Sequence, residues 1–235
     1  MGRGKNEKIN WNAIFKALEK WRDDAASPLG ANDPSVTTVA EHYRNDSSAD
    51  RPWAVFVSTI LSLRTKDEVT LAASERILKA AANPSQLHSM NEEKIAKLIY
   101  PVGFYRNKSS SLKKIAAILL AQYEGKVPST MEELLALPGV GRKTANLVLT
   151  EAFDIDALCV DIHVHRISNR CGWLSSDTPE ETEMTLREIL PLKYWKRINY
   201  LLVLYGQRLC RPVSPFCSCC IIKKYCIRRD IGRSR

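Results

Sequence analysis

Residues 137–145 read Leu-Pro-Gly-Val-Gly-Arg-Lys-Thr-Ala, and this stretch joins two helical patterns through a short turn. An apolar pattern ends at Pro138, two glycines permit a tight turn, and a second pattern runs on through Leu149. The start of that second helix presents unpaired N–H groups and the positive end of the helix dipole, which together bind phosphate. Glycines in such turns also serve backbone geometry alone. The stretch therefore predicts a helical hairpin and leaves its function open.

The rest of the chain also shows helical patterns. Apolar residues recur every three or four positions near the N-terminus, at Trp11, Ile14, Phe15, Leu18 and Trp21. Further helices are predicted at about 53–64, 67–82, 91–100, 108–123 and 130–137. Capping boxes are expected at 129–132 and 178–181, where a hydroxyl residue is followed three positions later by Glu. No stretch alternates with period two, so the predicted fold class is all-α.

Lys143 lies in the first turn of the second helix of the hairpin. The positive end of a helix dipole disfavours the charged form of a lysine placed there. A surface lysine gains nothing from this position, whereas an amine that acts as a nucleophile does. We interpret Lys143 as a candidate nucleophile. A lysine that only contacts DNA phosphate is the alternative.

Asp161 directly precedes another helical pattern, which continues through Ile167 to Cys171. Aspartate in this position is typical of a helix N-cap. His163 and His165 stand two residues apart and do not share a helix face, so no metal-binding pair is predicted. Asp161 can also be interpreted together with Lys143. An enzyme that removes a base from DNA needs a nucleophile at the sugar C1′ and an anion that stabilises the developing positive charge, and an amine and a carboxylate from two helix starts would supply both.

Charge and hydropathy exclude several classes of protein. The net charge is +9, yet residues 193–235 hold eleven Lys and Arg against one Asp, so this segment carries the whole excess. A nucleic acid is the first partner that such a segment predicts, with an anionic membrane surface or a merely solvated tail as alternatives. The longest apolar run, 115–121, is too short to span a bilayer, and residues 1–5 lack a signal-peptide pattern. We expect no membrane association and a location in the reducing cytoplasm or nucleoid.

Five of the seven cysteines gather near the C-terminus, at Cys210, Cys217, Cys219, Cys220 and Cys226. In a reducing compartment, clustered thiols hold metal more often than they form disulfides. The spacing C-x6-C-x2-C-x5-C suits a [4Fe–4S] cluster, and it also leaves a zinc site with four cysteine ligands open. Cys217 with Cys219 is an alternative pair within this loop.

The hairpin, the segment Val160-Asp161 and the cysteine loop follow one another here in the order and spacing of the endonuclease III family. The sequence from about Arg51 to Cys226 resembles these DNA glycosylases with apurinic/apyrimidinic lyase activity. Residues 137–145 resemble the helix-hairpin-helix element by which DNA repair proteins hold a phosphate without reading sequence. Residues 98–105 and Gly206-Gln207 also resemble family segments.

The resemblance implies a two-domain fold with DNA in the cleft between the domains. A six-helix barrel domain is expected at 45–155, with the hairpin at about 130–150, and a cluster domain from 1–26 with 156–235. Residues 27–52, which hold three prolines, are expected to form a linker-like segment. We expect a monomer.

The resemblance also implies roles for individual residues. Lys143 is the expected catalytic amine and Asp161 the catalytic carboxylate. A structural [4Fe–4S] cluster is expected on Cys210, Cys217, Cys220 and Cys226. The residues expected to contact DNA are Gly139, Val140, Gly141, Arg142, Thr144, Arg64, His163 and Arg211.

Three departures from the family pattern bear on function. Arg64 stands where the family often has Gln, at a position that fills the space left by a flipped base, so wedge function and opposite-base preference are open. Ile162 replaces the usual Thr after the catalytic Asp, and we expect a packing change there. Arg211 is the only basic residue between Cys210 and Cys217, which predicts a weaker grip on phosphate.

The leading hypothesis is a bifunctional glycosylase and lyase of base excision repair that acts on oxidised pyrimidines in double-stranded DNA, or on abasic sites. A glycosylase for mismatched or alkylated bases is the second hypothesis; Arg64 keeps it open, whereas Lys143 argues against it. The third is a non-catalytic DNA-binding protein with a zinc-stapled tail. It leaves the pairing of Lys143 with Asp161 unexplained.

Overall fold

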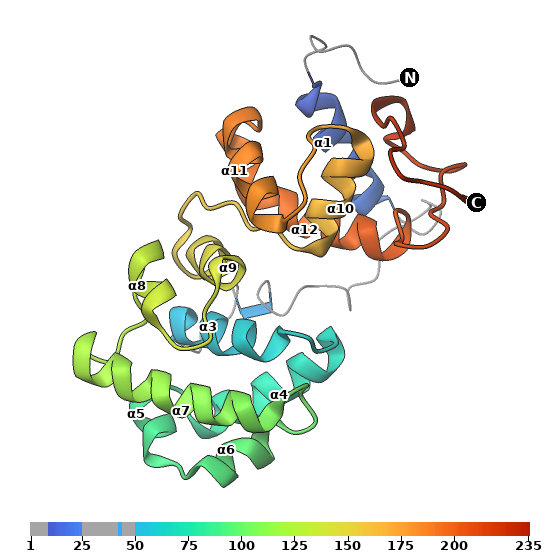
Figure 1. Cartoon of the computed structure of the whole chain (residues 1–235). Coiled ribbons are helices and arrows are strands. Elements are labelled where there is room, and N and C mark those ends of the chain that lie inside the picture. The colour runs from blue at the N-terminus through green and yellow to red at the C-terminus, as the bar shows by residue number, and fades with distance from the viewer. Residues whose placement is uncertain (1–8, 25–41, 44–49) are drawn as a thin grey trace. The chain divides into compact units, whose positions relative to one another are not determined.

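The computed structural model describes residues 9–24, 42–43 and 50–235 (Figure 1). Every regular element in these residues is a helix, which confirms the all-α class. The chain divides into two compact units. One boundary lies between Ala157 and Leu158, and the other falls among the undescribed residues 25–41. No described helix is both long and apolar enough to cross a bilayer.

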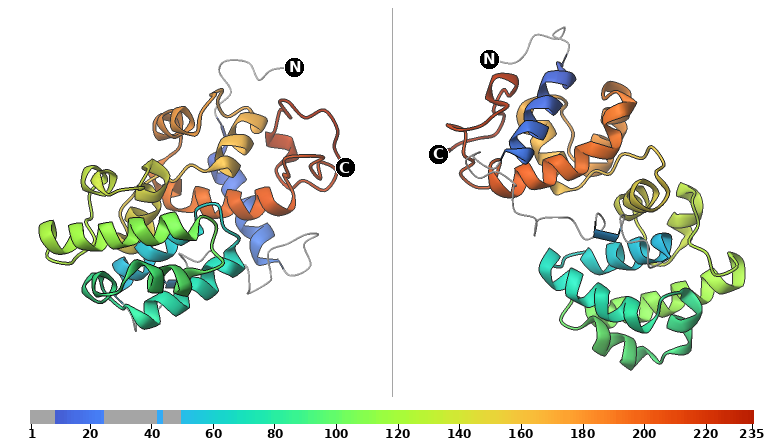
Figure 2. Two further views of the ribbon diagram at one scale, coloured as in Figure 1. Left: turned by 60° about the horizontal axis from the view of Figure 1, so that its bottom comes forward. Right: turned by 180° about the vertical axis from the view of Figure 1, so that it is seen from behind.

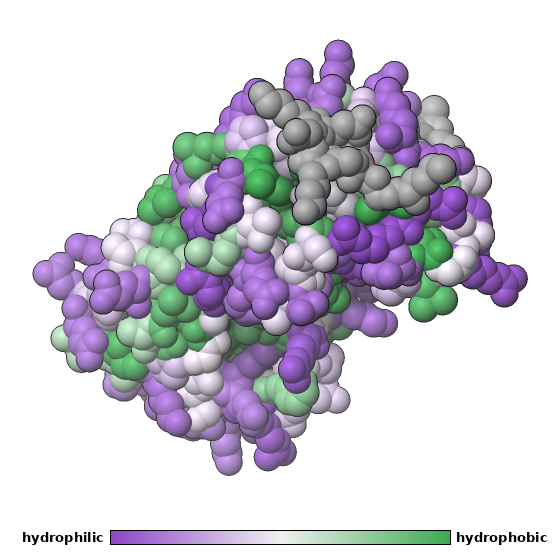
Figure 3. Space-filling view, turned by 45° about the horizontal axis from the view of Figure 1, so that its top comes forward, coloured by the Kyte–Doolittle hydropathy of each residue, from purple (hydrophilic) through white to green (hydrophobic). Residues whose placement is uncertain are grey.

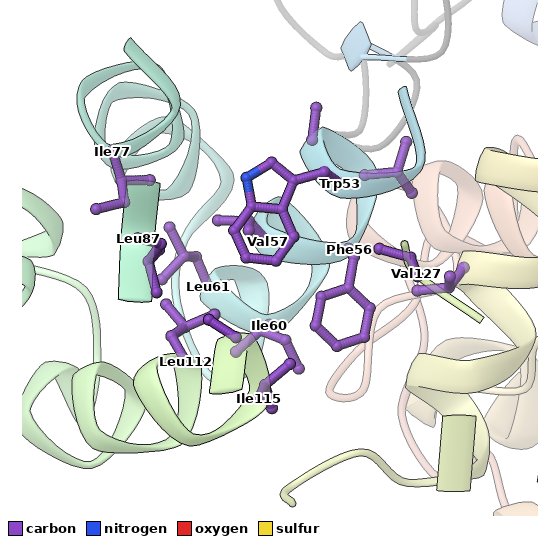
Figure 4. Packing of buried hydrophobic residues seen from close by; sticks show 14 of the residues in the cluster. Trp53, Phe56, Val57, Ile60, Leu61, Ile77, Leu87, Leu112, Ile115 and Val127 are labelled. Carbon is purple, nitrogen blue, oxygen red and sulfur yellow. The ribbon is translucent and has the colours of Figure 1, made fainter. Parts of the chain in front are cut away.

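The middle unit is built around α3 (Arg51–Ser62), which is buried on nearly all sides. A helix that is apolar all round must be enclosed by others, and α3 packs against α4 (Asp67–Ala80), α7 (Tyr105–Gln122) and α9 (Arg142–Phe153). Figure 4 shows Trp53, Phe56 and Leu61 of α3 among apolar side chains of neighbouring helices. This core fixes the position of α9, the second helix of the hairpin.

Three shorter helices complete this unit: α5 (Pro84–Ser89), α6 (Glu92–Ile99) and α8 (Met131–Ala136). Helix α5 escaped prediction because one and a half turns carry too little periodicity. The capping box before α8 lies one residue later than predicted: Thr130 accepts from the Glu133 N–H at 3.3 Å and donates to the Glu133 carboxylate at 2.6 Å. The predicted linker-like segment 27–52 is too long, because Arg51 and Pro52 already belong to α3; most of the segment lies outside the described residues.

The other unit joins the N-terminal helix to the C-terminal part of the chain. Helix α1 (Trp11–Asp23) packs against α12 (Trp195–Arg208), and the two further views in Figure 2 show them side by side. The predicted apolar stripe of α1 is buried as expected, and Trp11 Nε1 donates to the Ile189 carbonyl at 2.9 Å. Phe15 stacks on Tyr194 with ring centroids 4.1 Å apart.

This unit also contains α10 (Ile162–Cys171), which packs against α12 and α11 (Pro179–Ile189), the short η1 (Leu192–Tyr194), and η2 (Lys223–Tyr225) in the C-terminal loop. The cap predicted at Thr178 is confirmed, since its hydroxyl accepts from the Glu181 N–H at 3.2 Å, whereas the Glu181 carboxylate accepts from the Asp177 N–H at 2.8 Å instead of that of Thr178. The space-filling view shows hydrophilic side chains over much of the visible face, with apolar ones scattered among them (Figure 3).

Candidate functional site

The hairpin has the geometry that its glycines predict. Helix α8 ends at Ala136, and the Val140 N–H donates to the Leu137 carbonyl at 3.2 Å to close the turn. Gly139 has φ +80°, a left-handed conformation that strains residues with a Cβ. Gly141 is the N-cap of α9, and a Cβ placed on it would meet no atom within 4 Å. The approach to the N-terminus of α9 is therefore open, as binding of a phosphate there requires.

The hairpin residues expected to contact DNA differ in exposure. Arg142 is half-buried, whereas the side chains of Val140 and Thr144 are buried, at 8% and 3% exposure. Neither Val140 nor Thr144 presents its side chain to a ligand, so a phosphate at this turn would meet only their backbone.

Lys143 is exposed in the first turn of α9. Its charge acts on Asp67, the first residue of α4 in the same unit. Burial raises the pKa of Asp67, and Lys143 opposes this rise because its positive charge favours the carboxylate. The sequence pattern did not predict Asp67 as a neighbour of Lys143. Nothing in the spacing between α4 and α9 indicates that electrostatic interaction.

Asp161 is the N-cap of α10, as its position in the sequence predicts. Its Oδ1 accepts from the backbone N–H groups of His163 and Val164, both at 2.9 Å, and the residue is only 8% exposed. These bonds fix the orientation of the carboxylate at the N-terminus of α10. Asp161 and Lys143 belong to different units, and each is held by its own helix start.

The two residues after Asp161 have different surroundings. Ile162 is 68% exposed, so its methyl groups pack little against the described part of the chain. His163 lies against α12, because a Cβ on Gly206 would stand 2.5 Å from its Nδ1. The same Nδ1 lies 3.1 Å from Nη2 of Arg166. His163 thus has a packing role that its position beside the carboxylate did not indicate.

Arg64 lies in the turn between α3 and α4, is exposed, and has φ +54°. Its guanidinium carbon stands 5.6 Å from the ring centroid of Phe104, which is itself 60% exposed. An exposed cation over an exposed aromatic ring forms a flat, charged surface that suits base stacking and phosphate contact.

The cysteine loop follows α12 and packs on the core of its unit. Cys210, Cys220 and Cys226 are half-buried and close enough to influence one another electrostatically. Cys217 is half-buried, whereas Cys219 is exposed and bonds only weakly to the Phe216 carbonyl, with 3.7 Å between sulfur and oxygen. Among the described residues, no three His, Cys, Asp or Glu side chains converge on one point as ligands of a single ion.

Cys171, the last residue of α10, is a sixth thiol in this region, beside the five cysteines of the loop, and its place here was not predicted from the sequence. It is buried and interacts with Cys210, Cys220 and Cys226. A hydrogen bond with Cys171 lowers the pKa of Cys226 to about 7, while the same bond together with burial raises the pKa of Cys171. Within this pair, Cys226 is the thiol that ionises more readily. Cys171 lies far from the loop in sequence, so spacing carried no signal of it.

Two arginines of α10 tie this helix to the cysteine loop. Nη2 of Arg166 donates to the carbonyls of Gly206 and Cys210, at 3.1 and 2.9 Å. Arg170 donates to the Arg211 and Pro212 carbonyls, each at 2.6 Å, and its Nη1 lies 3.7 Å from the Cys210 sulfur. The loop is therefore anchored to the same helix whose N-cap is Asp161.

Part of the positive charge of residues 193–235 serves this loop. The guanidinium groups of Arg211 and Arg235 lie over the ring of Phe216, 5.5 and 5.2 Å from its centroid. Nη1 of Arg229 donates to the Leu174 carbonyl at 2.9 Å. Part of the basic excess therefore stabilises the loop and its surroundings.

Comparison with known proteins shows that this chain is similar to DNA repair proteins. The chain matches the HhH-GPD superfamily of base excision DNA repair proteins over residues 57–192. Endonuclease III of Thermotoga maritima is 46% identical over 188 residues, which make up 80% of this chain and 88% of that protein. The chloroplastic endonuclease III homolog 2 of Arabidopsis thaliana is 40% identical over 92% of this chain, which spans 57% of that longer protein.

Solved structures agree with the sequence comparison. A trapped covalent intermediate of endonuclease III with DNA, in an estranged-adenine complex, superposes with a TM-score of 0.75 and 28% identity. The match covers 92% of this chain and 95% of that one.

Proposed function

Because the chain belongs to the endonuclease III family, within the HhH-GPD superfamily of base excision DNA repair proteins, we propose that it is a DNA glycosylase that also cleaves abasic sites. It acts on damaged, chiefly oxidised, pyrimidines in double-stranded DNA. The observation that carries this proposal is the exposed amine of Lys143, held in the first turn of α9 directly after an open phosphate-binding turn.

Binding begins with the DNA backbone. The N–H groups at the start of α9 donate hydrogen bonds to a phosphate, and basic side chains add attraction that does not depend on sequence. The damaged nucleotide is then rotated out of the duplex, at a lower free-energy cost than a sound nucleotide because it pairs and stacks poorly. Arg64 enters the space that the nucleotide leaves.

Lys143 carries out the chemical steps. Its Nζ attacks C1′ of the damaged nucleotide, the C1′–N bond breaks, and the base departs with a proton. Opening of the sugar ring and loss of a proton from Nζ give a Schiff base between Lys143 and C1′. Loss of a proton from C2′ then expels the 3′ phosphate and cuts the strand, after which water hydrolyses the Schiff base. Asp161 stabilises the positive charge on the sugar as the base leaves and assists proton transfer.

Sodium borohydride tests this proposal directly, because it reduces a Schiff base to a stable amine. We expect covalent trapping of the protein on duplexes with thymine glycol or an abasic site, and little trapping on undamaged duplex. The test is a denaturing gel across a panel that also holds uracil, mismatches and alkylated purines. Trapping on none of these duplexes would contradict the lyase proposal, while base release from only mismatched or alkylated duplexes would contradict the lesion class.

The cysteine loop is proposed to hold a [4Fe–4S] cluster on Cys210, Cys217, Cys220 and Cys226. Three of these thiols are half-buried neighbours, and the hydrogen bond with Cys171 lowers the pKa of Cys226, which favours the thiolate form that binds iron. Each thiolate of such a cluster binds a different iron, so the four sulfurs need not converge on one point. When bound, the cluster holds the loop together. The chain's own contribution is the anchoring of the loop by Arg166 and Arg170.

Metal analysis decides between this cluster and zinc. We expect a brown protein with about four irons per chain, as the proposed cluster requires, and negligible zinc. Removing the metal by oxidation and chelation should lower the thermal stability of the unit that contains α10 and α12, because the loop packs on its core. Stoichiometric zinc in a colourless preparation would contradict the proposed cluster.

A further inference from the structure

Lys108 of α7 is a buried lysine that the proposed reaction does not use. The residue is 8% exposed, and its Nζ donates to the Leu61 carbonyl at 2.8 Å, the Leu63 carbonyl at 2.6 Å and the Thr65 hydroxyl at 3.3 Å. An ammonium has three N–H groups, and these three acceptors match them. Burial lowers the pKa of Lys108 to about 8. Keeping the charged amine in this place therefore costs desolvation free energy, which a methionine of similar length would not.

All three acceptors belong to the end of α3 and the turn that follows it. The same turn is held from a second side by Gly103, whose N–H donates to the Thr65 hydroxyl at 3.1 Å. A Cβ on Gly103 would stand 2.6 Å from the Arg64 carbonyl oxygen, so the two backbones touch. Lys108 and Gly103 together leave the turn little freedom to move.

The turn presents Arg64 in a conformation that needs such support. Arg64 and Phe104 both have left-handed backbones, with φ +54° and +57°. Residues with a Cβ adopt this conformation at a cost, and it persists where the surrounding structure imposes it. The contacts of the turn with Lys108 and Gly103 therefore keep Arg64 and Phe104 in this conformation on the surface.

The turn also lies near the candidate nucleophile. Helix α4 begins at Asp67, two residues after Thr65, and the carboxyl of Asp67 feels the charge of Lys143. Arg64 is thus presented on the part of this unit that carries the reactive amine.

We propose that Lys108 is a positioning residue that locks the turn 63–66, so that Arg64, stacked on Phe104, enters the duplex where the damaged base is extruded. This inference rests on the proposed glycosylase function. Lys108 touches neither substrate nor reacting atoms, and its effect passes through Arg64. It therefore matters for opening a base pair and is dispensable for the chemistry at C1′.

Lys108→Met tests this division, and Lys113→Met is its matched control. Lys113 lies on the same helix, and its Nζ donates to carbonyls of His88 and Met90, away from the turn. Two substrates are compared under single-turnover conditions: a duplex with a thymine glycol pair, and a single strand with an abasic site, which has no pair to open. We expect Lys108→Met to slow excision in the duplex by about ten- to a hundredfold and to leave cleavage of the single strand unchanged. Lys113→Met should alter neither rate.

A fluorescent base gives a second readout. With 2-aminopurine opposite the lesion, binding of the wild-type protein should raise the fluorescence as the pair opens, and Lys108→Met should reduce this rise. Should Lys108→Met fail to fold, Thr65→Val removes the shared hydroxyl and is expected to show the same duplex-specific loss.

Two results would overturn the inference: equal slowing on both substrates, which indicates a general structural role, or no slowing on the duplex. A wild-type protein that cleaves neither substrate would instead refute the proposed function, and the inference with it.

Discussion

Lys143→Gln is expected to abolish borohydride trapping and to slow strand cleavage at an abasic site by on the order of a thousandfold or more. Glutamine has a similar length and no nucleophilic amine, so it removes the group that forms the Schiff base. Lys143 is exposed, and its replacement leaves no cavity in the core. The free energy of unfolding should therefore stay close to that of the wild type. Single-turnover cleavage and a denaturing gel after borohydride measure the loss.

Arg142→Gln is the matched control for this variant, because it removes the neighbouring positive charge in the same turn of α9. It should weaken binding to duplex DNA and reduce its salt dependence, and trapping at saturating protein should persist. A Lys143→Gln protein that still traps on abasic DNA would show that another amine is the nucleophile.

Asp161→Asn is expected to slow excision of a damaged base by about a hundred- to ten-thousandfold while keeping the fold. Asparagine caps helices as well as aspartate does, so the bonds to the His163 and Val164 N–H groups are retained. What the variant loses is the negative charge that stabilises the developing cation on the sugar. The measurement is single-turnover base release from a thymine glycol duplex, with thermal unfolding as the check on the fold.

Asp161→Ala separates the two roles of this carboxylate. It removes both charge and cap, so it should match the catalytic loss of Asp161→Asn and in addition lower the free energy of unfolding by about 1 kcal/mol. Should Asp161→Asn excise at the wild-type rate, Asp161 would be a helix cap alone.

Much of the fold follows from short-range patterns. The stripe of α1, the cap at Thr178 and the hairpin glycines all depend on residues within four positions of one another, and each lies in the structure as predicted. Such patterns fail where the signal is brief, as in α5, or where two hydroxyl residues compete for one cap, as Ser129 and Thr130 do before α8.

In the candidate site, too, features with local sequence signals were predictable and long-range contacts were not. The placement of Lys143 at one helix start and Asp161 at another is readable from the chain, because helix ends have local signatures. Three other contacts cannot be predicted from the sequence. They are the hydrogen bond between Cys171 and Cys226, the packing of the His163 ring against Gly206, and the hydrogen bonds of Lys108 to the turn at Arg64. These contacts join residues far apart in the chain, and they exist only once packed helices bring distant side chains within a few ångströms. The amino-acid sequence by itself thus determined the helices and their ends, whereas the surroundings of each reactive group depend on tertiary packing.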